Sequence, residues 1–325
     1  MNKSKHQRGA ALLMALMTVA LIAMLAAAGV WQQWRTVSVE TAERQAQQSR
    51  WLLAGAQDWA RVVLREDGRN GGADHLAEPW ALPLQEARLS TFLAANASGV
   101  LASDTGLADQ VFLSGRITDM QSRLNLSNLV VNGQIDADEW RIWQRLYLQM
   151  GLPEAELRSW TSRLKTAMQT HPPANADVVP QRVEQLSWLG MSHHSLLRLA
   201  PHITVLPTPT TINLNTASAE VLFASIPGLD MHTAQQWVSA RNNKPWDSLN
   251  DFRQRMGPLA QAVSDKRHNV NSAYFEITGQ LRFQDSVMAE HSLVKREGIV
   301  SKTVWREHQP WYSAQGCISR IQPPC

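Results

Sequence analysis

The sequence has almost no cysteine. Its 325 residues contain two, Cys317 and Cys325, and both lie at the C-terminal end. The chain before Cys317 can therefore form neither a disulfide framework nor a cysteine-based zinc site. In an oxidising compartment the two thiols could close a small loop. A dispensable tail explains them equally well, so the sequence leaves their pairing open.

Charge is missing from one long stretch near the N-terminus. No Asp, Glu, Lys or Arg lies between Arg8 and Arg35, and nearly all of residues 10–30 are apolar. A helix needs about 20 such residues to cross the hydrocarbon core of a bilayer. Because Lys3, Lys5 and Arg8 precede the stretch, and positive flanks stay cytoplasmic, we expect one membrane span with most of the chain outside.

A removable signal peptide is the main alternative for this stretch. Such peptides also start basic, and Ala26-Ala27-Ala28 offers a small-residue cleavage site, but their apolar part is usually about 7–15 residues long. Beyond the apolar stretch, apolar residues recur at steps of three and four from Trp31 to Val63. This pattern predicts one retained helix from about Ala10 to Leu64, apolar all round in its first half and amphipathic in its second.

Sequence motifs of catalysis are also missing. The chain has no G-x-S-x-G elbow, P-loop, H-E-x-x-H pair or dinucleotide fingerprint. Its formal net charge is only +3, which does not by itself call for a nucleic-acid partner. We therefore expect a protein that is not an enzyme.

Strand patterns flank a central stretch that reads as helical. Apolar and polar residues alternate after Val111 around Gly115, and again after Tyr274 around Gly279, which predicts two hairpins. Residues 298–312 add another strand. The expected fold class is α+β, with a long N-terminal helix packed on an antiparallel sheet and a large all-α insert between two of its strands.

One segment of the insert invites a calcium interpretation. Asn132, Gln134, Asp136 and Asp138 alternate as ligands in a calcium loop do, but the turn Gly and the terminal Glu of such a loop are missing. Asp136 followed by Glu139 is instead typical of a helix N-terminus. We expect a helix cap here.

Residues 213–257 resemble a helix-hairpin-helix module, a SAM-like element that usually grips DNA phosphates. The hairpin falls at Pro227-Gly228, but Asp230 stands where a second Gly permits close approach of a phosphate. Four basic and four acidic residues balance over the segment, whereas a DNA binder needs a basic surplus. We therefore expect a structural or protein-binding element and no nucleic-acid partner.

The N-terminus resembles the signature of type IV prepilins: a short basic leader, a glycine, then a small residue that opens an apolar helix. The resemblance implies that a prepilin peptidase cuts between Gly9 and Ala10 and that the apolar helix is retained. Most pilins carry Glu at the fifth mature position, where this chain has Met14. The K-type minor pseudopilins of type II secretion systems lack that Glu and carry a helical insert, so the chain resembles them over nearly its whole length.

This resemblance implies a function, a compartment and partners. The chain would start or cap the tip of a pseudopilus that exports folded proteins across the outer membrane. It would sit in the inner membrane with a cytoplasmic N-terminus and a periplasmic bulk, beside I- and J-type minor pseudopilins. The rival interpretation is a membrane-anchored DNA-uptake protein that uses the helix-hairpin-helix element.

The expected organisation has six successive parts. They are a leader (1–9), the transmembrane half of the helix (10–32), a first part of the pseudopilin domain (33–123), a helical insert (124–270), a second sheet part (271–313) and a tail (314–325).

The resemblance also implies calcium in the sheet domain. Gly68, Gly71 and Gly72 predict a loop after the long helix, and a polar loop with Trp80 packed on the sheet accounts for its neighbourhood without any ion. The candidate ligands offer carboxylate or amide oxygens, which hard cations prefer. They are Asp67, Asp74 and Glu78 near this loop, and Asp119, Asn125 and Asp285 near predicted sheet turns.

Overall fold

The structure is a computed structural model that describes residues 6–96, 109–283 and 286–313. The chain divides into two compact units, Met1–Ala54 and Gly55–Cys325, and each is described by itself. Asp285, Cys317 and Cys325 lie outside the described residues.

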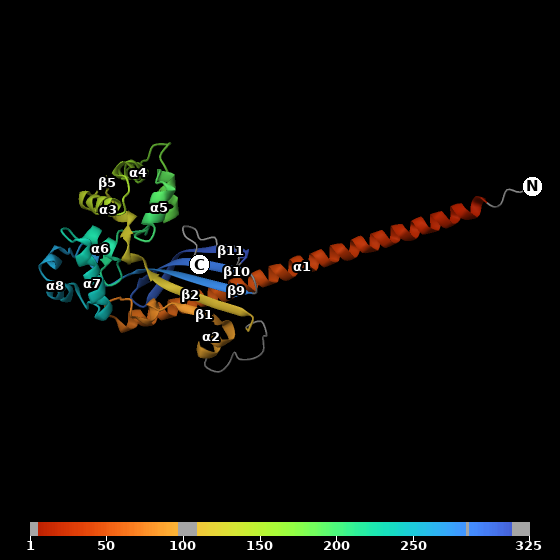
Figure 1. The fold of residues 1–325 in the computed structure, drawn as a ribbon, viewed down its shortest axis with the longest axis horizontal. Coiled ribbons are helices and arrows are strands. Elements are labelled where there is room, and N and C mark those ends of the chain that lie inside the picture. Colours follow the sequence, from red (N-terminus) through yellow and green to blue (C-terminus); the bar gives the residue numbers. More distant parts are fainter. Residues whose placement is uncertain (1–5, 97–108, 284–285, 314–325) are drawn as a thin grey trace, which may run out of the picture. The chain divides into compact units, whose positions relative to one another are not determined.

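The first helix, α1, spans His6–Asn70 and is longer at both ends than predicted (Figure 1). The expectation that Gly68 belongs to a loop is wrong, since the helix continues past it. The turn that ends α1 comes at Gly71 and Gly72, whose φ angles of 65° and 111° suit residues without a Cβ. By length and composition, α1 is apolar enough to cross a membrane.

Short helices make up most of the chain between the sheet strands. The remaining α-helices are α2 (Leu89–Asn96), α3 (Ala137–Gln149), α4 (Glu154–Ala167), α5 (His193–Leu199), α6 (Ala219–Ser225), α7 (Met231–Asn243) and α8 (Leu249–Met256). Short 3₁₀ turns include Pro79–Ala81 and Val183–Leu189. Asp136, Ser218 and Ser248 cap α3, α6 and α8 through their side chains, as the sequence predicts for α3.

An antiparallel sheet of five strands forms in the order β1-β2-β9-β10-β11 (Figure 1). The strands are β1 (Leu84–Arg88), β2 (Val111–Asp119), β9 (Tyr274–Phe283), β10 (Ser286–Glu297) and β11 (Val300–Ser313). All of α3 to α8 fall between β2 and β9 in sequence, yet these two strands pair directly, from Val111 with Phe283 to Asp119 with Phe275. The predicted helical insert between two sheet strands is thus confirmed.

The predicted hairpin turns at Gly115 and Gly279 are wrong. Both glycines lie inside straight strands and face each other across the β2–β9 ladder. A Cβ on Gly115 would come within 2.7 Å of the Thr278 carbonyl oxygen. Gly115 therefore permits close strand packing, a use of glycine that alternation in a sequence does not distinguish from a turn.

The part of α1 after residue 54 packs on the sheet. Ala60 and Leu64 join Trp80, Phe275, Ile277 and Val294 in one buried apolar cluster. Within this interface the Gln57 amide group accepts a 2.6 Å bond from the Ser292 hydroxyl and donates to the Ile277 carbonyl. Burying an amide beside apolar residues is tolerated because these bonds satisfy it.

The helical region has its own apolar core. It is built on aromatic side chains with little or no exposure, among them Trp143, Trp160 and Trp246. The Trp160 indole N–H donates to the Tyr147 hydroxyl at 2.7 Å, and Trp143 meets Trp160 edge to face at 5.4 Å. Four two-residue strands form parallel pairs that each close one half of the region, β3 (Leu124–Asn125) with β6 (Ile203–Thr204) and β7 (Ile212–Asn213) with β8 (His268–Asn269).

A pair of glycines in α1 tests the packing of its last turns. A Cβ on Gly68 would lie less than 3.0 Å from the Gly298 carbonyl oxygen in the β10–β11 turn, whereas a Cβ on Gly55 meets nothing within 4 Å. We expect Gly68→Ala to destabilise the protein by roughly 1–3 kcal/mol through overpacking. Gly55→Ala should stabilise it by about 1 kcal/mol through helix propensity. Urea unfolding of the full chain in detergent micelles measures both, and an equal response would contradict the packing.

Candidate metal centre and the junction of sheet and helical region

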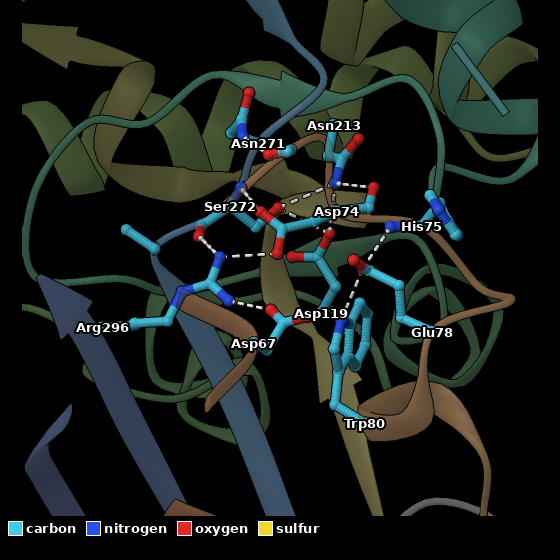
Figure 2. Close-up of polar contacts among 12 residues, drawn as sticks. Asp67, Asp74, His75, Glu78, Trp80, Asp119, Asn213, Asn271, Ser272 and Arg296 are labelled. Carbon is cyan, nitrogen blue, oxygen red and sulfur yellow. Dashed lines mark hydrogen bonds and ion pairs between the residues drawn. The ribbon is translucent and has the colours of Figure 1, made fainter. Parts of the chain in front are cut away.

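Three of the predicted ligands come together at the C-terminal end of α1. Asp67 lies in the last turn of that helix, Asp74 in the following loop and Glu78 just before the Pro79–Ala81 turn. One carboxylate oxygen from each lies within 4.8 Å of the other two (Figure 2). A Ca²⁺ ion holds its oxygen ligands at about 2.3–2.6 Å, so a single ion could reach all three.

A guanidinium group already occupies part of this cluster. Arg296, on β10, donates to Asp67 and, at 2.5 Å, to Asp74 Oδ1, and its second bond from Nη2 goes to the Ser272 carbonyl at 3.0 Å (Figure 2). The Arg296 and Asp74 side chains are only 9% and 3% exposed. The sequence gives no signal for this pairing, because Arg296 follows the loop by more than 200 residues.

Hydrogen bonds from neighbouring residues fix the Glu78 side chain. Its Oε2 accepts the His75 backbone N–H at 2.8 Å and the Trp80 indole N–H at 2.7 Å. Trp80 is buried and meets Phe275 edge to face, which confirms the expectation that it packs on the sheet. Trp80 packing and the gathering of carboxylates, which the sequence posed as alternatives, therefore occur together.

Burial raises the proton affinity of the cluster. Desolvation raises the pKa of Asp74 to about 6, although Arg296 and the Ser272 N–H favour its charged form. Desolvation likewise raises the pKa of Glu78 to about 7, and the nearby carboxylates of Asp67 and Asp74 add to the rise. A cavity of about 230 Å³ opens beside these groups, lined also by Gly71, Gly72 and Asn271.

Asp119 does not line this cavity, and its carboxylate accepts hydrogen bonds from other segments of the chain. It is fully buried at the end of β2, where Thr216, Ser272 and Asn213 donate to its Oδ2 at 2.5, 2.7 and 3.0 Å (Figure 2). Its Oδ1 accepts the Gln121 backbone N–H at 2.7 Å. Burial raises the pKa of Asp119, while these donors favour its charged form. The protein itself supplies all of these hydrogen-bond donors. Asp119 therefore links segments of the chain and does not face the cavity.

The Asn125 side chain makes its hydrogen bonds elsewhere in the fold. The Asn125 side chain accepts from the Ser127 and Leu206 N–H groups and donates to the Thr208 carbonyl, so it fixes the 206–210 segment. Asp285 lies outside the described residues. The hydrogen bonds of Asn125 thus serve the fold, and its role as a calcium ligand stays a prediction.

The alternating residues before α3 form a cap, as predicted. Asp136 Oδ1 accepts the backbone N–H groups of Asp138 and Glu139 at 3.0 and 2.9 Å. Arg267 then pairs with Asp138 and Glu139 at 2.9 and 3.0 Å. These carboxylates are thus engaged by backbone donors and a guanidinium.

Side chains of the protein itself bind the polar groups at the hairpin of the helix-hairpin-helix element. Asp230 caps α7 by accepting the Thr233 N–H at 2.9 Å, and this bond lowers the pKa of Asp230. From α3, Arg145 donates to the carbonyls of Ile226 and Leu229 at 2.7 and 2.9 Å. A carboxylate thus stands at the helix end where a phosphate would bind, as expected for a structural use of the module.

Removing Arg296 tests its role among the carboxylates. Arg296→Met leaves Asp67 and Asp74 without their cation, and breaking a buried pair in this way costs about 3–5 kcal/mol. Asp74 is buried, so without Arg296 it gains a proton more readily in the folded than in the unfolded chain, and the loss should be larger at pH 8 than at pH 5. Urea unfolding at the two pH values measures it. Arg141→Met, which breaks an exposed pair with Asp138, is the matched control and should have little effect.

Comparison with known proteins agrees with the fold. Two family models, both described as type II secretion system protein K, match residues 122–208 and 212–271. Type II secretion system protein K of Pseudomonas aeruginosa is 25% identical over 312 residues, which cover 86% of each chain. The protein of the same name from Klebsiella pneumoniae is 26% identical over 346 residues, covering 95% of this chain and 98% of its own.

A solved structure shares the fold. One chain of the GspK-GspI-GspJ complex from enterotoxigenic Escherichia coli, determined by crystallography, superposes with a TM-score of 0.62 at 18% identity, over 83% of this chain and 98% of that one. The long helix, the antiparallel sheet and the helical region are thus common to both. In sequence the chain is therefore similar to the type II secretion system protein K family of minor pseudopilins, and in fold to GspK.

Proposed function

We propose that this protein starts or caps the tip of the pseudopilus, anchored in the inner membrane by α1 with its N-terminus in the cytoplasm and its sheet and helical region in the periplasm. The observation that carries the proposal is the composition of α1, whose first acidic residue is Glu40. Lys3, Lys5 and Arg8 precede the apolar stretch and favour this orientation.

Met14 supports the first position in the filament. In the pilin pattern, the carboxylate at this place pairs with the N-terminal amine of a neighbouring subunit. A charge in an apolar bundle is costly unless it is paired, so a subunit with no neighbour above it is better without one. Met14 is exposed on α1, where it can pack against apolar helices without such a partner.

The Escherichia coli complex supports the choice of partners, since it contains GspK together with GspI and GspJ. We carry this assembly over to the present chain. Its large helical region, between β2 and β9, would then prevent a further subunit from adding above it. The DNA-uptake alternative receives no support from the family match or from the hairpin, where Asp230 stands at the helix end.

Two measurements test the membrane half of the proposal. Mass spectrometry of the protein from its native host should give a mature chain that begins at Ala10. Met14→Glu should lower recovery of the complex with the I- and J-type pseudopilins at least several-fold, because a carboxylate without a partner among apolar helices is costly. Met14→Leu, which keeps the position apolar, should behave as the native protein. Another N-terminus, or normal assembly of Met14→Glu, would contradict the proposal.

The proposal includes a calcium ion at Asp67, Asp74 and Glu78. The three oxygens are spaced for one ion, and the cavity beside them is lined by polar groups. Arg296 competes for Asp67 and Asp74, but each carboxylate oxygen has more than one lone pair. The residues therefore fit a hard cation, which would offset the repulsion among the acids and fix the loop after α1.

Calcium binding should depend on pH. Because the folded pKa values of Asp74 and Glu78 lie near 6 and 7, protons occupy the site at pH 5 and leave it by pH 8. Calcium should therefore raise the melting temperature of the chelator-treated protein at pH 8 and have little effect at pH 5. Glu78→Gln should abolish most of this rise, whereas Glu86→Gln, on exposed β1, should keep it. An unchanged melting temperature at pH 8 would exclude the ion.

A further inference from the structure

The end of the apolar stretch in α1 carries a feature that the tip assignment does not use. Trp31 and Trp34 are the first aromatic residues of the chain, and polar Gln32, Gln33 and Arg35 lie among and after them. Both indoles lie on one side of the helix, with ring centroids 5.7 Å apart. They are 67% and 64% exposed, so no part of the described chain covers them.

The stretch before this pair has the length and polarity of a bilayer core. Residues 10–30 contain one polar side chain, Thr18, whose hydroxyl donates to the Ala15 carbonyl within the helix at 2.8 Å. Satisfying polar groups internally is what a hydrocarbon environment requires. About 21 helical residues rise about 32 Å, close to the roughly 30 Å of the core. With Trp31 at one boundary, Ala10 therefore lies at the other.

The positions of the charged residues do not by themselves fix the depth of α1 in the bilayer. The uncharged segment between Arg8 and Arg35 has about 26 residues and rises about 39 Å, which exceeds the hydrocarbon core by about 9 Å. Arg35 can also snorkel, and the residues after it include Val37 and Val39, so the helix could slide by a turn or more. Tryptophan prefers the interface itself, since its ring is apolar and its N–H seeks a polar partner.

We propose that Trp31 and Trp34 bind the lipid headgroup region and set the depth of α1, which places Ala10 at the opposite face of the bilayer. This inference rests on the membrane anchoring in the proposed function. The two indoles act at one end only, because the N-terminal end has basic residues and no aromatic one. The pair thereby also positions the junction between Gly9 and Ala10 at the membrane surface.

The near absence of cysteine makes the test direct. In a Cys317→Ser, Cys325→Ser background, single cysteines are placed at Leu21 and at Ser38 and labelled with bimane. The full chain is reconstituted in vesicles of phosphatidylcholine and phosphatidylglycerol that contain lipids with a nitroxide on the acyl chain. We expect quenching at the Leu21 position and little at the Ser38 position. Trp31→Leu with Trp34→Leu should let the helix slide by about one turn, roughly 5 Å, and raise quenching at Ser38 several-fold.

Trp51→Leu is the matched control, since Trp51 is also exposed on α1 but follows the apolar stretch by some 20 residues. It should leave both reporters unchanged. Equal quenching at Ser38 with and without Trp31 and Trp34 would overturn the anchor, and would indicate that the pair awaits a protein partner instead. An unquenched reporter at Leu21 would show that the helix does not span, which overturns the membrane part of the proposed function as well.

Discussion

Separate segments of the chain meet at one buried carboxylate, that of Asp119. It ends β2, and it accepts bonds from Asn213 and Thr216 of the helical region and from Ser272 just before β9. Asn213 also donates to the Asp74 carbonyl, and Ser272 donates its N–H to the Asp74 carboxylate. The strands that carry the helical region, the region itself and the loop after α1 are therefore joined in a single network of short hydrogen bonds. A buried carboxylate is stable only when such donors surround it.

The candidate metal site lies on the outer side of this network. Arg296 binds both Asp74 and Asp67, which connects the charged cluster to the C-terminal end of α1. Its bond to the Ser272 carbonyl connects the cluster to the segment just before β9. Any proton or cation taken up there changes the charge next to the network that joins the helical region to the sheet. The raised pKa values of Asp74 and Glu78 have the same origin, since both acids are partly removed from water.

Local patterns predicted the elements better than their contacts. The uncharged run predicted α1, the capping residue Asp136 predicted the start of α3, and the loop carboxylates Asp67, Asp74 and Glu78 were found because they are close in sequence. Gly115 and Gly279 were misread because a glycine in a turn and a glycine facing another strand look alike in one sequence. Arg296 and Asn213 carried no signal, because their partners are brought to them only by the pairing of distant strands.

The direct pairing of β2 with β9 has a consequence for folding. If these strands met first, they would close a loop of about 150 unstructured residues, at an entropic cost of about 4 kcal/mol. A helical region that has already folded, with its two halves closed by the β3–β6 and β7–β8 ladders, removes most of that cost. We therefore expect the sheet to form last. Until β9 pairs with it, β2 exposes one edge, and such an edge invites pairing with other chains.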